Sequence, residues 1–157
     1  TGSIVLQVHL VTPVPAAGAL RVTSPPGFTA PLSCSVAVIQ GPTGAAASGV
    51  DCSASTGAAG EMAVLVKPSG GGTLSAGLYR LRLASVANPA AVANPASAST
   101  ACGTEQCWLF QSFQDSAGSV ALDKEGSVAG FAVLAKMPRA LLVDLTEAQR
   151  VAVGRTD

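Results

Sequence analysis

Short runs of alternating apolar and polar residues, each ended by proline or glycine, constrain this sequence more than any other feature. Residues 4–10 carry a large apolar side chain at every second position, and residues 78–83 repeat the alternation with two arginines. A period of two predicts β-strands, because successive side chains of a strand point to opposite faces. Turn-forming stretches such as 12–18 ("TPVPAAG") and 25–31 ("PPGFTAP") separate the runs.

About ten such runs follow one another at the spacing typical of two-sheet folds. The one helix-like signal is a capping-box pattern at residues 146–149, which is long enough for a single helical turn. The sequence therefore predicts an all-β protein, namely an immunoglobulin-like or Greek-key β-sandwich with disulfides and one long Pro/Ala/Ser-rich loop.

Composition favours a single folded domain and excludes some classes of partner. The chain has 157 residues, of which 48% are hydrophobic and 11% are charged, and its formal net charge is zero. Nucleic-acid-binding proteins carry a basic patch, and none is visible, so we expect no nucleic-acid partner. Apolar runs stay shorter than the roughly 18 residues of a transmembrane helix, so we expect no membrane insertion. Because the chain starts at Thr1 without methionine, we expect a processed product or a piece of a longer protein.

The four cysteines indicate disulfides. Cys34 and Cys52 lie on two strand-like runs joined by a loop, and Cys102 and Cys107 close the short segment "CGTEQC". We expect the pairs Cys34–Cys52 and Cys102–Cys107, although four cysteines allow three connectivities. Disulfides imply an oxidising compartment and hence an extracellular or cell-surface protein. The alternative is four reduced, buried cysteines.

One segment, residues 86–107, departs from the strand rhythm. It repeats "VANPA" and continues through alanine, serine and threonine. A loop of this length is functional or a linker more often than a plain connection. Ser97, Ser99 and Thr100 are candidate O-glycosylation sites, because Ser/Thr tracts with proline carry such sugars. The simpler alternative is a surface loop lying over the sandwich.

Residues able to support catalysis are few. His9 is the only histidine, and its position among the apolar residues of the first strand predicts an outward side chain. Asp115 starts an Asp-x-x-Gly turn, and Asp123 belongs to a charged stretch that we interpret as a solvated turn. Trp108 and Phe110 share one strand face and are expected in the core rather than in a sugar platform. We expect no enzyme activity, no cofactor and no metal site.

Three stretches together resemble a known group of proteins. They are residues 10–28 ("LVTPVPAAGALRVTSPPGF"), residues 76–90 continuing into 107–123 ("CWLFQSFQDSAGSVALD"), and the closing residues 142–157. They are similar to the immunoglobulin-like β-sandwich repeats of large protist and algal cell-surface proteins, including flagellar-hair (mastigoneme-type) proteins. The resemblance implies a secreted structural module that repeats in tandem or assembles with copies of itself, and it implies no catalytic residues.

The end of the chain gives the most specific hypothesis. Two apolar runs follow the expected sandwich domain of residues 1–138, within a terminal segment of residues 139–157. An uncovered apolar strand is an aggregation hazard unless another surface covers it. We expect this segment to pack on a neighbouring subunit or the next repeat, head to tail, or else to fold back beside residues 4–10. The expected anchors are Leu141, Leu142, Val143, Leu145, Val151 and Val153.

The sequence leaves two candidate functions for this chain. The first is a non-catalytic structural module of an extracellular filament or surface coat, on a cell surface such as that of a flagellum. The second is a cell-surface adhesion or glycan-binding module. A self-associating chain favours the first, whereas a monomer with a ligand groove favours the second.

Overall fold

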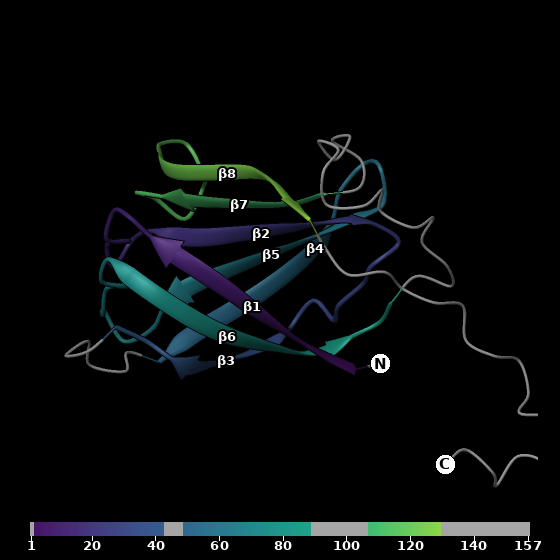
Figure 1. The fold of residues 1–157 in the computed structure, drawn as a ribbon, viewed down its shortest axis with the longest axis horizontal. Helices are drawn as coiled ribbons and strands as arrows, with labels where there is room; N and C mark the ends of the chain where they lie inside the picture. The colour runs from purple at the N-terminus through teal and green to yellow at the C-terminus, as the bar shows by residue number, and fades with distance from the viewer. Residues whose placement is uncertain (1, 43–48, 89–106, 130–157) are drawn as a thin grey trace, which may run out of the picture.

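The computed structural model describes residues 2–42, 49–88 and 107–129 of the chain, and all regular structure in these ranges is β-strand (Figure 1). No helix long and apolar enough to cross a membrane occurs among them. The eight strands are β1 (Gly2–Leu10), β2 (Ala19–Pro26), β3 (Ser35–Gln40), β4 (Val50–Thr56), β5 (Glu61–Pro68), β6 (Gly77–Val86), β7 (Cys107–Phe113) and β8 (Ala121–Ala129).

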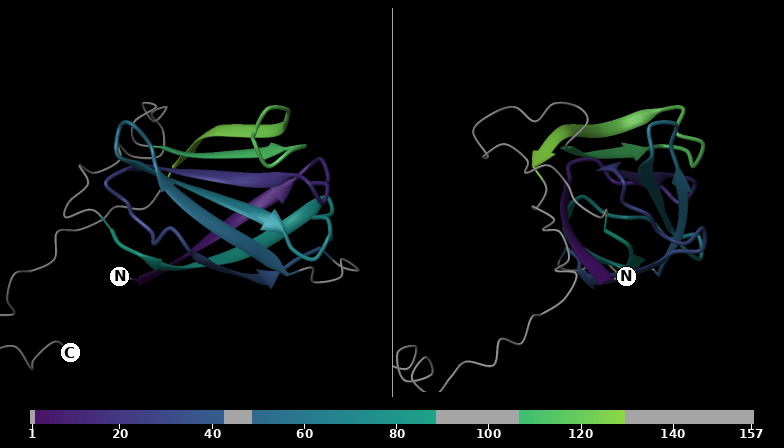
Figure 2. Two further views of the ribbon diagram at one scale, coloured as in Figure 1. Left: turned by 180° about the vertical axis from the view of Figure 1, so that it is seen from behind. Right: turned by 90° about the vertical axis from the view of Figure 1, so that its right-hand side faces the viewer.

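The strands form two antiparallel sheets. One has three strands in the order β1-β6-β3, and the other has five in the order β4-β5-β2-β7-β8. In Figure 1 the smaller sheet lies in front of the larger one, and Figure 2 shows the two layers from behind and from the side. The prediction of an all-β, two-sheet protein is therefore confirmed. Chain-adjacent β1 and β2 lie in different sheets, so the proline-rich stretch between them crosses from one layer to the other.

Alternation along the strands builds the core between the sheets. In β1 the side chains of every second residue from Ile4 to Leu10 are buried, and those between them are exposed. Arg80 and Arg82 of β6 face outward while the residues between them are buried, as the sequence predicted. From the larger sheet, alternating residues of β2 and β5 fill the same core, together with Trp108. The ring of Phe28 lies 5.2 Å from that of Trp108, so the loop after β2 also packs into this core.

The turn between β7 and β8 has a fixed shape. Asp115 accepts hydrogen bonds from the backbone N–H groups of Ser119 (3.1 Å) and Val120 (3.0 Å), which confirms its expected role as a turn residue. Gly118, in the same turn, has a φ of 78° and lies under the guanidinium group of Arg21. That guanidinium in turn lies 4.8 Å from the centre of the Phe113 ring.

One sequence interpretation is wrong. The charged residues 123–125 do not form the solvated turn that the sequence predicts, because they lie within the continuous strand β8. They pair along β7, where Lys124 is opposite Gln111 and Glu125 is opposite Phe110. Cross-strand pairing and the contacts of Asp123 described below keep these charged residues in a strand.

Candidate functional site

An open groove lies at one edge of the sandwich. The five-stranded sheet extends beyond the three-stranded one, so β7 and β8 lie past β1 with no strand of the smaller sheet in front of them (Figure 1). The resulting cavity has a volume of about 520 Å³ and lies between residues 7–11 on one side and β7 and β8 on the other. We call this cavity the edge groove.

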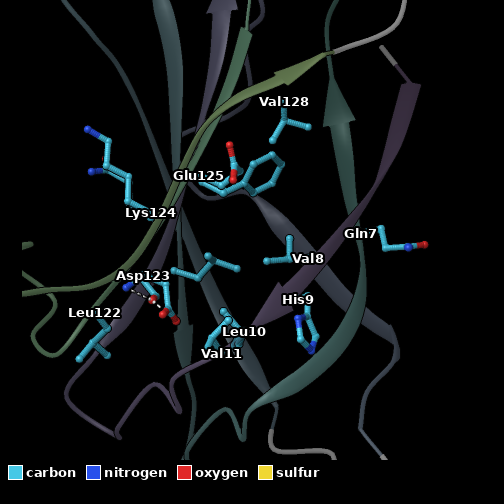
Figure 3. Close-up of a pocket in the computed structure, with 14 residues that line it drawn as sticks. Gln7, Val8, His9, Leu10, Val11, Leu122, Asp123, Lys124, Glu125 and Val128 are labelled. Atoms are coloured by element: carbon cyan, nitrogen blue, oxygen red, sulfur yellow. Dashed lines mark hydrogen bonds between the residues drawn. The ribbon is translucent and has the colours of Figure 1, made fainter. Parts of the chain in front are cut away.

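Apolar side chains form most of the inner surface of the edge groove. Val8 and Leu10 contribute from β1, Leu20 from β2, Phe110 from β7 and Val128 from β8. Figure 3 shows the labelled side chains of β1 on one side of the groove and those of β8 on the other. Phe110 and Val128 are only partly buried although they pack on the core. The groove therefore offers unfilled apolar surface continuous with the core.

The edge of β1 forms one wall of the edge groove. Within the described residues β1 pairs with β6 alone, in a register that runs from Gly2 opposite Val86 to Leu10 opposite Gly77. In an antiparallel pair, alternate residues turn both backbone groups toward the partner strand, so the others point theirs away from it. Such an edge presents a row of N–H and C=O groups to which another strand can pair.

Asp123 closes one end of the edge groove. Its carboxylate accepts hydrogen bonds from the backbone N–H of Thr12 (2.9 Å), the hydroxyl of Thr12 (3.1 Å) and the hydroxyl of Ser112 (3.2 Å). The backbone N–H of Asp123 donates to the same Ser112 hydroxyl at 3.0 Å. These contacts fix the end of β1 against the β7–β8 hairpin, so the groove has a definite width there.

The opposite edge of the sandwich is closed covalently. Cys34, just before β3, and Cys52 of β4 form a disulfide whose Cα atoms are 5.4 Å apart, and it joins the two sheets. Cys107 is disulfide-bonded as well. Cys102 lies outside the described residues, so the pair Cys102–Cys107 stays a prediction.

The other residues singled out in the sequence fall into two groups. His9 is exposed, as predicted, and lies on the β1 side of the edge groove. Trp108 is buried in the core, which agrees with the core interpretation. The expected glycosylation sites (Ser97, Ser99 and Thr100) and the expected assembly anchors (Leu141, Leu142, Val143, Leu145, Val151 and Val153) lie outside the described residues.

The chemistry of the edge groove suits binding of an extended chain. It combines an apolar inner surface with a row of backbone hydrogen-bonding groups, the two elements that strand addition requires. Among residues 2–42, 49–88 and 107–129, no three His, Cys, Asp or Glu side chains come together in a way that could hold a metal ion.

Comparison of this chain with protein-family models, with curated proteins and with solved structures found no match.

Proposed function

We propose that this chain is a non-catalytic structural module of an extracellular filament or surface coat, whose copies join head to tail by strand complementation. The observation that carries the proposal is the edge groove, where, among the residues that the structure describes, an unpaired strand edge lies beside uncovered apolar surface. A free edge and an apolar groove in one place are an association site in solution. The low proportion of charged residues, 11%, leaves little repulsion between copies.

The strand order supports an immunoglobulin-like reading of the sandwich. In that fold one sheet contains the second, fifth and fourth strands side by side, and the other pairs the third with the sixth. Here β2, β5 and β4 are neighbours, and so are β3 and β6. In our reading β1, beside β6, takes the place that the last strand has in that fold, and β7, beside β2, takes the place of the first.

The proposed location rests on the disulfide chemistry. The Cys34–Cys52 bond joins the two sheets covalently at the edge where β3 and β4 lie. Disulfides of this structural kind persist outside the cytosol, in oxidising surroundings. We therefore place the module outside the cell or on its surface, including flagellar surfaces, consistent with the resemblance to cell-surface repeats.

Removal of residues 139–157 tests the assembly. The full chain should grow in mass with concentration in light scattering, because each copy supplies one donor segment and one groove. The shortened chain should remain a folded monomer, since it keeps every core residue of the ranges that the structure describes. Filaments formed by the shortened chain would contradict strand donation, and an unfolded product would instead indicate that the segment completes its own sandwich.

A second candidate is an adhesion or glycan-binding module. The outer face of the smaller sheet carries Arg80 and Arg82. Their cross-strand neighbours, none of which has a carboxylate, are Gln7, Val5, Ala37 and Gln40. Arginine forks match the carboxylate and sulfate groups of acidic polysaccharides. Retention on an acidic polysaccharide column that is lost in the double variant Arg80→Gln/Arg82→Gln would favour this candidate.

A further inference from the structure

We infer that the edge groove receives residues 140–145 of a second copy as an added strand, antiparallel to β1. This inference rests on the proposed head-to-tail assembly and names the surface that accepts the donated segment. Four observations carry it: the edge of β1 that no other described strand pairs with, the apolar inner surface of the groove, the length of that surface, and the alternation of the donor segment.

The length of the groove suits an extended strand better than a compact ligand. The wall of the groove on the β1 side is formed by residues 7–10 of β1, which extend over roughly 14 Å at about 3.4 Å per residue, and by Val11, which follows the strand. Residues 140–145 span six positions, so they are long enough to cover that wall. A strand placed there would give the smaller sheet a fourth member directly in front of β7 and β8.

Only one face of the donor segment is wholly apolar, and this face can pack on the apolar inner surface of the groove. Leu141, Val143 and Leu145 occupy alternate positions, so in a strand they point to one face, while Ala140, Leu142 and Asp144 point to the other. The first set is wholly apolar and is suited to the surface formed by Val8, Phe110 and Val128. The second set contains the carboxylate of Asp144, which belongs in solvent.

Strand direction favours a neighbouring copy over the chain's own segment. In Figure 1, β1 runs toward the end of the sandwich at which β8 begins, so β1 and β8 run in opposite directions. A segment that left the end of β8 and turned straight back into the groove would run parallel to β1. Parallel pairing is slightly less stable per residue and needs a longer connection. A segment from a second copy arrives free of that constraint and can pair antiparallel.

The site gives each copy one donor and one acceptor on different surfaces. Such a contact is heterologous, and it repeats into an open chain unless the rotation between copies closes a ring. Two kinds of full-length variant can therefore isolate the contact. Val128→Asp places a charge inside the groove and leaves the donor segment intact. Val143→Asp places a charge on the donor segment and leaves the groove intact.

The test measures the mass of each variant by light scattering at concentrations where the wild-type chain assembles. Each variant alone should be monomeric, and an equimolar mixture should give dimers and nothing larger, because only one functional contact remains per pair. Leu142→Asp, on the opposite face of the donor segment, should weaken assembly at least tenfold less than Val143→Asp. Circular dichroism establishes that every variant is folded.

Two exposed positions allow a further test in which the substitutions should not unfold the protein. Val11 is 71% exposed and lies in the groove, whereas Leu32 is 79% exposed and lies near the disulfide edge. Val11→Asp should weaken assembly about tenfold, and Leu32→Asp should leave it unchanged.

The outcomes separate this inference from the proposed function. If the wild-type chain assembles and both groove variants assemble equally well, the edge groove is not the acceptor, and head-to-tail assembly through another surface survives. A wild-type chain that stays monomeric at every concentration would overturn the proposed assembly itself, and this inference with it.

Discussion

Removal of the Asp123 carboxylate should destabilise the fold by about 2 to 3 kcal/mol. The group accepts three hydrogen bonds, at 2.9, 3.1 and 3.2 Å, from Thr12 and Ser112. A hydrogen bond to a charged group contributes roughly 1.5 kcal/mol or more, which gives a simple sum near 4.5 kcal/mol. The site is only half-buried, so in Asp123→Ala water replaces part of each lost hydrogen bond. Hydrogen bonds that share one acceptor group also do not contribute additively, so the expected loss is smaller than the simple sum.

The amide variant separates the charge from the geometry. In Asp123→Asn the amide oxygen can still accept from the Thr12 N–H, and the amide nitrogen can donate to the Thr12 hydroxyl, which accepts as well as donates. We therefore expect Asp123→Asn to cost about 1 kcal/mol, well below the cost of the alanine variant.

Urea unfolding followed by tryptophan fluorescence measures these differences. Trp108 is the only tryptophan, is 4% exposed and lies on β7 beside the hairpin, so its emission reports on the region in question. Asp51→Ala, at an exposed position of β4, is the control and should stay within about 0.5 kcal/mol of wild type. An Asp123→Ala variant as stable as this control would refute the view that the carboxylate holds the groove end together.

Three further changes test other parts of the fold. Replacing both Cys34 and Cys52 by alanine should lower the free energy of unfolding by about 3 kcal/mol, as expected for a loop of 18 residues; an unchanged urea midpoint would contradict this. Hydrogen bonds from backbone N–H groups, of which that of Ser119 has the largest effect, hold the pKa of Asp115 below its ordinary value of 3.8. The contribution of Asp115 to stability is therefore present above pH 3.8 and is lost as the pH falls through the lower pKa of the folded state. An NMR titration midpoint at or above 3.8 would show this to be wrong. Gly77→Ala should cost about 1 kcal/mol more than Gly60→Ala in thermal unfolding, because both glycines have a positive φ but only at Gly77 would a Cβ meet a rigid group, the ring of Pro42 at 2.6 Å; equal losses would exclude that contact.

Periodicity predicted the strands well because burial on one face is a local property. The alternation of residues 4–10 and 78–83 gave the correct inward and outward faces of β1 and β6. The Cys34–Cys52 pair was also accessible to sequence reasoning, since two strand-like runs joined by a loop can approach each other.

The edge groove was not accessible to sequence reasoning. Its existence depends on which sheet each strand joins, and alternation shows only that a strand has two different faces. Asp123 illustrates the difficulty. In sequence it begins a run of three charges, which resembles a turn, but its partner Thr12 is 111 positions away. The structure of β8 follows from that distant contact and from its pairing with β7.

The disulfide and the edge groove lie at opposite edges of the sandwich, and this asymmetry has consequences for how the module opens. The two sheets are tied covalently where β3 meets β4, whereas Asp123 supplies the polar contacts at the β1–β8 edge. Separation of the layers should therefore begin at the β1–β8 edge and pivot about the disulfide. Backbone amides of β8 should exchange with solvent through small local openings, while those of β5 and β6 exchange only on global unfolding. In the filament that we propose, tension should therefore open this edge first and leave the arrangement of the other strands intact.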